Sequence, residues 1–156
     1  MGNRFLKPLY KFVYGEEFEP RDFEARMKLQ KEIYLLQEEG INVGDYDFLW
    51  YKHGPYSQTL QNDILNLSNT PDVELKYTDE AESILKELRT MIHNSTQYTL
   101  SQWVECLASL QYLRSNVFGR SAKEMDIINE LQTRKPHLNN RRENQKAIRL
   151  LKKYIG

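Results

Sequence analysis

The strongest constraint on the fold is a change of hydrophobic periodicity between residues 27 and 67. Its first part places Leu29, Ile33 and Leu36 at the spacing of one helical face. Aromatic residues then alternate with others over residues 46–51, which is typical of a strand. The pair Gly54-Pro55 interrupts this alternation because proline has no backbone donor, and a second helical pattern follows. This order predicts a helical domain that contains a small sheet.

Helix-capping signals divide the rest of the chain. Residues that can cap a helix N-terminus stand before five expected helices, at Asp22, Ser57, Thr78, Thr99 and Ser121. The last two begin capping boxes, which Gln102 and Glu124 complete. A short helix is also expected before Gly15, and a terminal helix over residues 140–154. The sequence therefore predicts five to seven helices.

A second strand is expected where Val73, Leu75 and Tyr77 alternate with charged residues. The prediction is a mainly α (α+β) fold with a two- or three-stranded antiparallel sheet built from residues 46–51 and 73–77. Residues 1–156 are expected to form a single domain. In it, residues 1–92 form a winged-helix-like core, and residues 99–156 form a C-terminal helical extension packed on that core.

Composition favours a globular protein. With 40% hydrophobic and 12% aromatic residues, the chain of 156 residues is rich enough in apolar groups to bury a core. The lone cysteine, Cys106, excludes an internal disulfide framework and fits a reducing compartment. No apolar run approaches the roughly 18 residues of a membrane span, and the N-terminal segment lacks the apolar region of a signal peptide. We therefore expect a cytoplasmic protein that does not bind membranes.

Charge is unevenly distributed, although 22 basic and 22 acidic residues balance overall. From residue 134 onward there are eight basic residues and one acid, a charge of +7, whereas the first 133 residues carry 14 bases and 21 acids, a charge of −7. In the terminal helix four bases share one face: Arg142, Lys146, Arg149 and Lys153. This face suits a nucleic-acid backbone or an acidic protein, and the alternative is a solvated face of a packed helix.

Motifs for catalysis are missing. The sequence contains no glycine-rich phosphate loop, no nucleophile elbow and no zinc-protease motif. No second histidine or cysteine stands at metal-ligand spacing beside His53, and His93 and His137 fall at expected loop or helix-end positions. Cys106 flanks an apolar stripe, where a buried small hydrophobe is more typical than a nucleophile. We expect a protein that is not an enzyme and uses neither a metal nor a cofactor.

Two blocks of residues occur together between positions 23 and 88. They are Lys28-Leu29-Gln30-Lys31-x-Ile33-Tyr34-Leu35-Leu36 and His53-Gly54-Pro55-Tyr56-Ser57-x-x-Leu60-x-x-Asp63-Ile64, with Tyr77-Thr78 further on. This pattern resembles the YwgA-like family of bacterial proteins, and the Panacea-domain antitoxins share a looser version of it. The resemblance implies a winged-helix-like fold and a bacterial or mobile-element (prophage) origin. It implies no established activity.

A winged-helix interpretation makes the helix after Gly54-Pro55 the recognition helix. That helix presents Gln58, Gln61 and Asn62, which can hydrogen-bond to the nucleobases of DNA. It contains no lysine or arginine for phosphate contacts. Its wing would have to fit within residues 69–77. Phosphate contacts would then come from the earlier cations Arg26, Lys28, Lys31 and Lys52, or from the terminal helix. Lys28 and Lys31 lie away from the apolar stripe, so both are equally expected as ordinary helix surface.

The sequence leaves two functions open. The first is a non-enzymatic winged-helix, helix-turn-helix type of transcription regulator that binds DNA, as a homodimer in which two half-sites add. The second is a protein-binding adapter or antitoxin-like protein that neutralises or recruits a protein partner. The candidate binding residues are the same for both: Lys28, Lys31, Lys52, Gln58, Gln61, Asn62, Arg142, Lys146, Arg149 and Lys153.

Overall fold

A computed structural model describes residues 3–67, 73–119 and 121–156. In this part the chain is mainly helical, with one two-stranded antiparallel sheet, which confirms the expected fold class. The elements are α1 (Leu6–Tyr14), α2 (Phe23–Glu38), β1 (Leu49–Tyr51), β2 (Gly54–Tyr56), α3 (Gln58–Leu65), α4 (Asp79–Ile92), α5 (Leu100–Tyr112), the π-helix η2 (Leu113–Phe118), α6 (Glu124–Arg134) and α7 (Arg141–Tyr154).

Most helices begin where the sequence predicts. The side chains of Asp22, Ser57 and Thr78 each accept a hydrogen bond from a backbone N–H in the first turn that follows, and Thr99 forms the expected capping box with Gln102. The box expected at Ser121 is wrong. The helix α6 starts later, after Lys123, so Glu124 stands in the first position, where its carboxylate favours the helix dipole.

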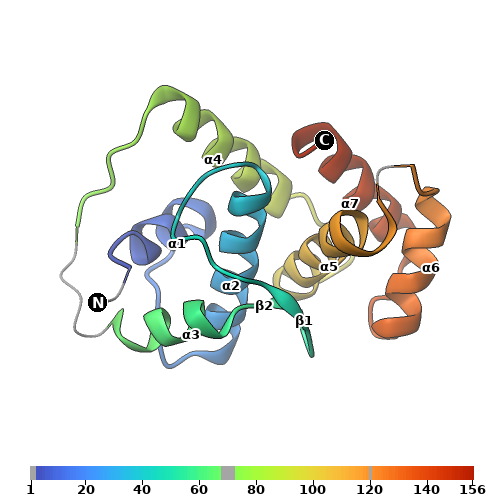
Figure 1. Cartoon of the computed structure of the whole chain (residues 1–156), viewed down its shortest axis with the longest axis horizontal. Coiled ribbons are helices and arrows are strands. Elements are labelled where there is room, and N and C mark those ends of the chain that lie inside the picture. Colours follow the sequence, from blue (N-terminus) through green and yellow to red (C-terminus); the bar gives the residue numbers. More distant parts are fainter. Residues whose placement is uncertain (1–2, 68–72, 120) are drawn as a thin grey trace.

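Two groups of helices meet in the middle of the molecule. Figure 1 shows α1, α2, α3 and α4 on one side and α5, α6 and α7 on the other. The central contact is between α2 and α5, and α1, α3, α4 and β2 also pack against α2. Because neighbours surround α2, ten consecutive or near-consecutive residues between Ala25 and Leu36 are buried, including polar ones.

The sheet differs from the prediction. Its strands β1 and β2 form a hairpin, in which Leu49, Trp50 and Tyr51 pair with Tyr56, Pro55 and Gly54 in that order. The segment Gly54–Tyr56 is thus a strand and not a break, since both strands of a two-stranded sheet are edges, where proline is tolerated. Residues 73–77 form no strand, so the expected pairing of residues 46–51 with 73–77 is wrong.

The expected first strand is also shorter. Tyr46 donates its backbone N–H to Gln37 Oε1 and accepts at its carbonyl from Gln37 Nε2, so a side chain replaces a strand partner here. The wing expected within residues 69–77 is not formed by residues 73–77, and residues 69–72 lie outside the described ranges. The hairpin lies before α3 in the chain and projects from the lower side of the molecule in Figure 1.

Gly54 brings the hairpin into close contact with α5. Its φ of +90° lies in the left-handed region, and a Cβ at this position would clash with Ser109 Oγ. Gly40 has a similar φ of +95° but no atom within 4 Å of the corresponding position. The two glycines therefore separate the cost of backbone conformation from the cost of a steric clash.

We predict that Gly54→Ala lowers the free energy of unfolding by about 2–4 kcal/mol, whereas Gly40→Ala lowers it by about 1–2 kcal/mol. Both substitutions strain the backbone, but only the first also overpacks a buried contact. Adding Ser109→Ala to Gly54→Ala should recover part of the difference. Urea unfolding of the wild type and these three variants measures these values, and equal losses at both glycines would contradict the close approach.

Candidate functional site

The two motif blocks contact each other. Gln30 Nε2 donates to the carbonyl oxygen of Ser57 at 2.9 Å, and the Ser57 N–H donates to Gln30 Oε1 at 2.9 Å. Lys31 Nζ donates to the carbonyl oxygen of Pro55 at 2.8 Å. These bonds join α2 to β2 and to the start of α3. We call these four residues, Gln30, Lys31, Pro55 and Ser57, the bracket.

Lys28 and Lys31 do not lie on the surface of α2, where the sequence pattern places them. Lys28 is 9% exposed, and its ammonium lies 3.2 Å from Glu16 Oε1 and over the ring of Tyr14. Lys31 is 1% exposed. Because elements pack around α2 on every side, cations opposite its apolar stripe are buried too, and buried charges need partners. Neither lysine is available to phosphates.

Besides Lys31, a second lysine holds the hairpin, from the end of α6. Lys135, directly after α6, donates from Nζ to the carbonyl oxygen of Tyr51 at 3.1 Å and to that of Lys52. The buried carboxylate of Glu105 on α5 lies 3.7 Å from Lys135 Nζ and 3.1 Å from His137 Nε2. The hairpin therefore rests on a buried cluster of charged groups.

Burial controls the charge of this cluster. Burial lowers the pKa of Lys31 to about 7, while the negative charge of Glu105 opposes that shift and Lys135 adds to it. Burial also lowers the pKa of Lys135 and the pKa of His53, and Glu105 opposes both of these shifts. The Lys31 amine therefore exchanges its proton near neutral pH.

We predict that the stabilising effect of Lys31 grows with pH. Between pH 7 and about 10 the unfolded chain holds a proton on Lys31 that the folded chain has released, so stability rises with pH in this window. The difference in unfolding free energy between the wild type and Lys31→Met should increase by at most about 1.4 kcal/mol per pH unit.

Urea unfolding at pH 6, 7, 8 and 9 gives this difference, because other titrating groups contribute to both proteins alike to first order. Lys76→Met changes an exposed lysine and serves as the control. A wild-type minus Lys31→Met difference that stays constant or falls from pH 7 to 9 would refute the assignment.

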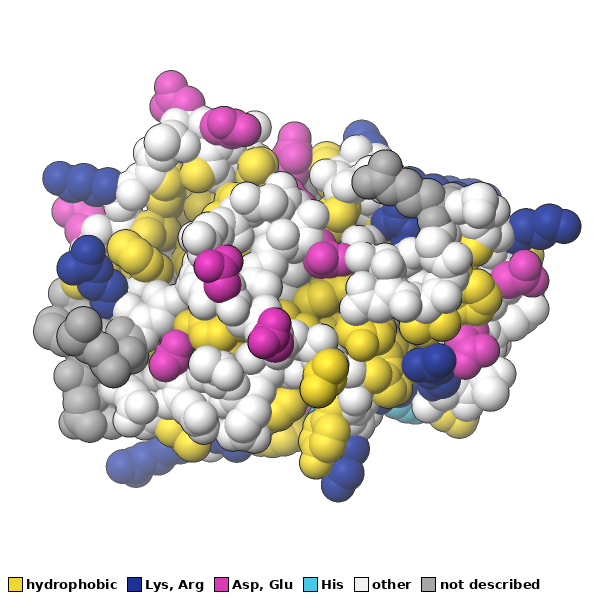
Figure 2. Space-filling view, in the orientation of Figure 1, with side chains coloured by type: hydrophobic (Ala, Val, Ile, Leu, Met, Phe, Trp, Pro, Cys, Tyr) yellow, Lys and Arg dark blue, Asp and Glu magenta, His cyan; other side chains and the backbone are white. Residues whose placement is uncertain are grey.

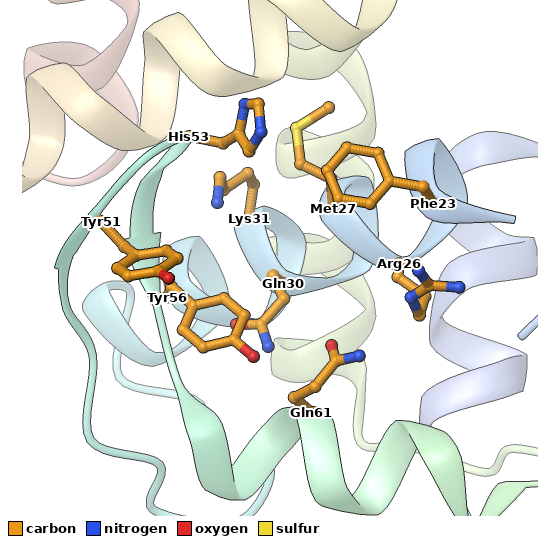
Figure 3. A pocket seen from close by; sticks show the side chains of 9 residues that line it. All are labelled: Phe23, Arg26, Met27, Gln30, Lys31, Tyr51, His53, Tyr56 and Gln61. Carbon is orange, nitrogen blue, oxygen red and sulfur yellow. The ribbon is translucent and has the colours of Figure 1, made fainter. Parts of the chain in front are cut away.

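A pocket opens beside the bracket. Its volume is about 190 Å³, and Figure 3 shows side chains from α2, the hairpin and α3 that face the same space. They are Phe23, Arg26, Met27, Gln30, Lys31, Tyr51, His53, Tyr56 and Gln61. The helix α2 supplies most of the wall, and the bracket fixes the distance from α2 to the other two elements.

Aromatic rings form the mouth of the pocket. Phe23 is 54% exposed and Tyr51 is 55% exposed, which is unusual for large apolar side chains that lie beside a hollow. The Tyr51 and Tyr56 rings lie 5.3 Å apart, and Phe23 meets the His53 ring edge-on at 5.3 Å. Figure 2 shows apolar side chains gathered around the projecting hairpin.

The polar groups of the pocket are cationic or neutral. Arg26 donates from one guanidinium nitrogen to the Pro20 carbonyl and lies over the Phe23 ring, which leaves further donors of its five for a ligand. No carboxylate is among the residues that line the pocket. The arrangement can therefore hold an apolar group whose neighbour is an anion.

The predicted site residues lie on separate surfaces. Gln61 lines the pocket, Gln58 and Asn62 are exposed on α3 and hydrogen-bond to each other at 3.0 Å, and Lys52 is exposed in the hairpin turn. The four bases of α7 lie in the other half of the molecule (Figure 1). Of the predicted residues, only Lys31 and Gln61 belong to the pocket.

Sequence reasoning missed most of the pocket. Phe23 and Met27 come from α2 and Tyr51 and His53 from the hairpin, and no spacing along the chain connects the two pairs. One signal was present: Phe23 is a large apolar residue directly after the cap residue Asp22, outside the buried stripe of its helix. Such a residue is either packed by a neighbour or left exposed.

Comparisons with protein-family models, with curated proteins and with solved structures found no match. Over the described ranges, no three histidine, cysteine, aspartate or glutamate side chains are placed to hold a metal ion. In the same ranges, none of the helices combines the length and the apolar character that crossing a membrane requires.

Proposed function

We propose that this chain is a non-enzymatic binding protein that holds a protein partner by one apolar side chain in the pocket between α2, the hairpin and α3. The observation that carries the proposal is the pair of exposed rings, Phe23 and Tyr51, at the mouth of a pocket with a volume of about 190 Å³. Exposed apolar groups around a hollow are typical of protein interfaces.

The size of the pocket favours a side chain over a whole small molecule. Pockets for drug-sized ligands measure roughly 300–1,000 Å³, whereas a cavity of about 150 Å³ holds a benzene molecule. A volume of about 190 Å³ accommodates one aromatic ring or one large aliphatic side chain. Such a side chain is the usual anchor of a protein interface.

Charge favours an acidic partner segment. Arg26 lines the pocket and no carboxylate does, so an acidic residue beside the anchor would meet a complementary charge. Lys28 and Lys31 are buried, so they cannot serve as phosphate contacts beside the expected recognition helix α3. Their burial supports the adapter over the regulator for this part of the molecule. The YwgA-like relationship stays a prediction, and the bracket gives a physical reason for its two blocks to occur together.

The pocket can be tested with p-cresol, which carries the ring of a tyrosine side chain. In protein with labelled methionine methyl groups, p-cresol should shift the Met27 resonance, saturating at roughly millimolar concentration, as expected for so few atoms. Met125, which is exposed and outside the pocket lining, is the internal control. Phe23→Ala should weaken binding, whereas Leu65→Ala, which removes a comparably exposed side chain (59%) from α3, should not.

A carboxylate added to p-cresol tests whether Arg26 attracts an anion to the pocket. The carboxylate analogue 4-hydroxyphenylacetate should bind more tightly than p-cresol to the wild type, and Arg26→Gln should remove this advantage. Equal shifts at Met27 and Met125 would contradict the pocket assignment.

Selection of random displayed peptides tests the protein partner directly. Enriched peptides should share one aromatic or large aliphatic residue beside an acid, and they should lose at least about tenfold in affinity for Phe23→Ala but not for Leu65→Ala, because only Phe23 borders the anchor. If p-cresol binds in the pocket but no selected peptide loses affinity for Phe23→Ala, the pocket is real and the proposed class of partner is wrong.

A further inference from the structure

A second charged surface lies on α7. Arg142, Arg149 and Lys153 are exposed, and Lys146 is half-buried. With Gln145 and Leu150, these four bases line a shallow hollow along one face of the helix, and no carboxylate is among its lining residues. At 1.5 Å per residue the row extends over about 16 Å, which is long enough to meet several phosphates of one strand.

The bases of this row differ from the other bases of α7. Lys152 lies 2.9 Å from Glu124, and Arg141 donates to Asn129 at 3.2 Å, so both are used in the contact with α6. Over the described ranges, Arg142 and Arg149 have no hydrogen-bond or ion-pair partner. The helix therefore pairs the cations that face its neighbour, and in the described part of the chain it leaves Arg142 and Arg149 of the outward row without such a partner.

One acid lies under the row and is already engaged. Burial would raise the pKa of Glu143, but hydrogen bonds from Thr96 and from Lys146 lower it to about 2. Lys146, 3.2 Å from this carboxylate and over the Trp103 ring, is consequently held in place and partly neutralised. The charge available to a partner comes mainly from Arg142, Arg149 and Lys153.

We propose that this face of α7 binds the phosphate backbone of double-stranded DNA. Surfaces for single strands add aromatic side chains on which bases stack, and helices that lie on membranes add tryptophan or phenylalanine to an exposed apolar face. The hollow has neither kind of residue. This surface is separate from the pocket, because no residue lines both of them.

Fluorescence anisotropy with a labelled 24-base-pair duplex of mixed sequence, at 50 and 200 mM salt, tests the proposal. The wild type should bind at 50 mM salt and weaken as salt increases. Arg142→Glu with Arg149→Glu should weaken binding at least about tenfold and reduce the slope of log affinity against log salt by about 2, since each phosphate contact contributes about 0.9.

Arg21→Glu with Lys76→Glu is the matched control, because it changes the net charge equally at two exposed bases far from α7 in the sequence. This control should bind within about threefold of the wild type. Circular dichroism melting verifies that both double variants are folded.

Four results would overturn the proposal: no binding by the wild type at 50 mM salt, equal losses in both double variants, tighter binding of the single strand than of the duplex, or displacement of the duplex by a polyglutamate peptide at equal charge. The last result would assign the surface to an acidic protein instead.

Discussion

The structure depends on buried side-chain donors that hold the carbonyl groups of a very short hairpin. Two strands of three residues are not stable alone in water. Here Gln30 and Lys31 bind the hairpin and the residue after it from α2, and Lys135 binds it from the end of α6. Because β2 leads directly into the cap of α3, the same bonds position that helix and the pocket wall.

This support requires charged groups in the interior. Lys31, Glu105 and Lys135 are almost fully buried, and the opposite charges partly compensate the loss of water. Burial moves the pKa of each lysine downward, so the neutral amine becomes accessible near physiological pH for Lys31. On α2, Glu32 is fully buried, its carboxyl oxygens have no hydrogen-bond partner among the residues that the structure describes, and burial raises its pKa well above the usual value.

The two proposed surfaces have different physical characters and lie in different halves of the molecule. The pocket is small, aromatic and rigidly framed by the bracket, which suits one anchoring side chain. The face of α7 is shallow and cationic, which suits the regularly spaced charges of a backbone. A chain with both surfaces could hold a protein partner and DNA at once, so the adapter and the regulator need not exclude each other.

The sequence by itself determined what depends on neighbours along the chain. Asp22, Ser57, Thr78 and Thr99 cap their helices as predicted, because a cap bonds to the N–H groups two or three residues away. The cationic face of α7 was equally predictable, since a helix places every third or fourth residue on one side whatever packs on the other.

Only the tertiary structure decided the rest. Gly54-Pro55 is locally a break in a strand pattern, yet it forms part of β2, which pairs with β1 and is held by the bond from Lys31 to the Pro55 carbonyl. Lys28 and Lys31 have the positions of surface residues in a helical pattern, and they are buried because five other elements surround α2. The pocket draws its lining from three elements, and no periodicity along a chain encodes how such elements face each other in space.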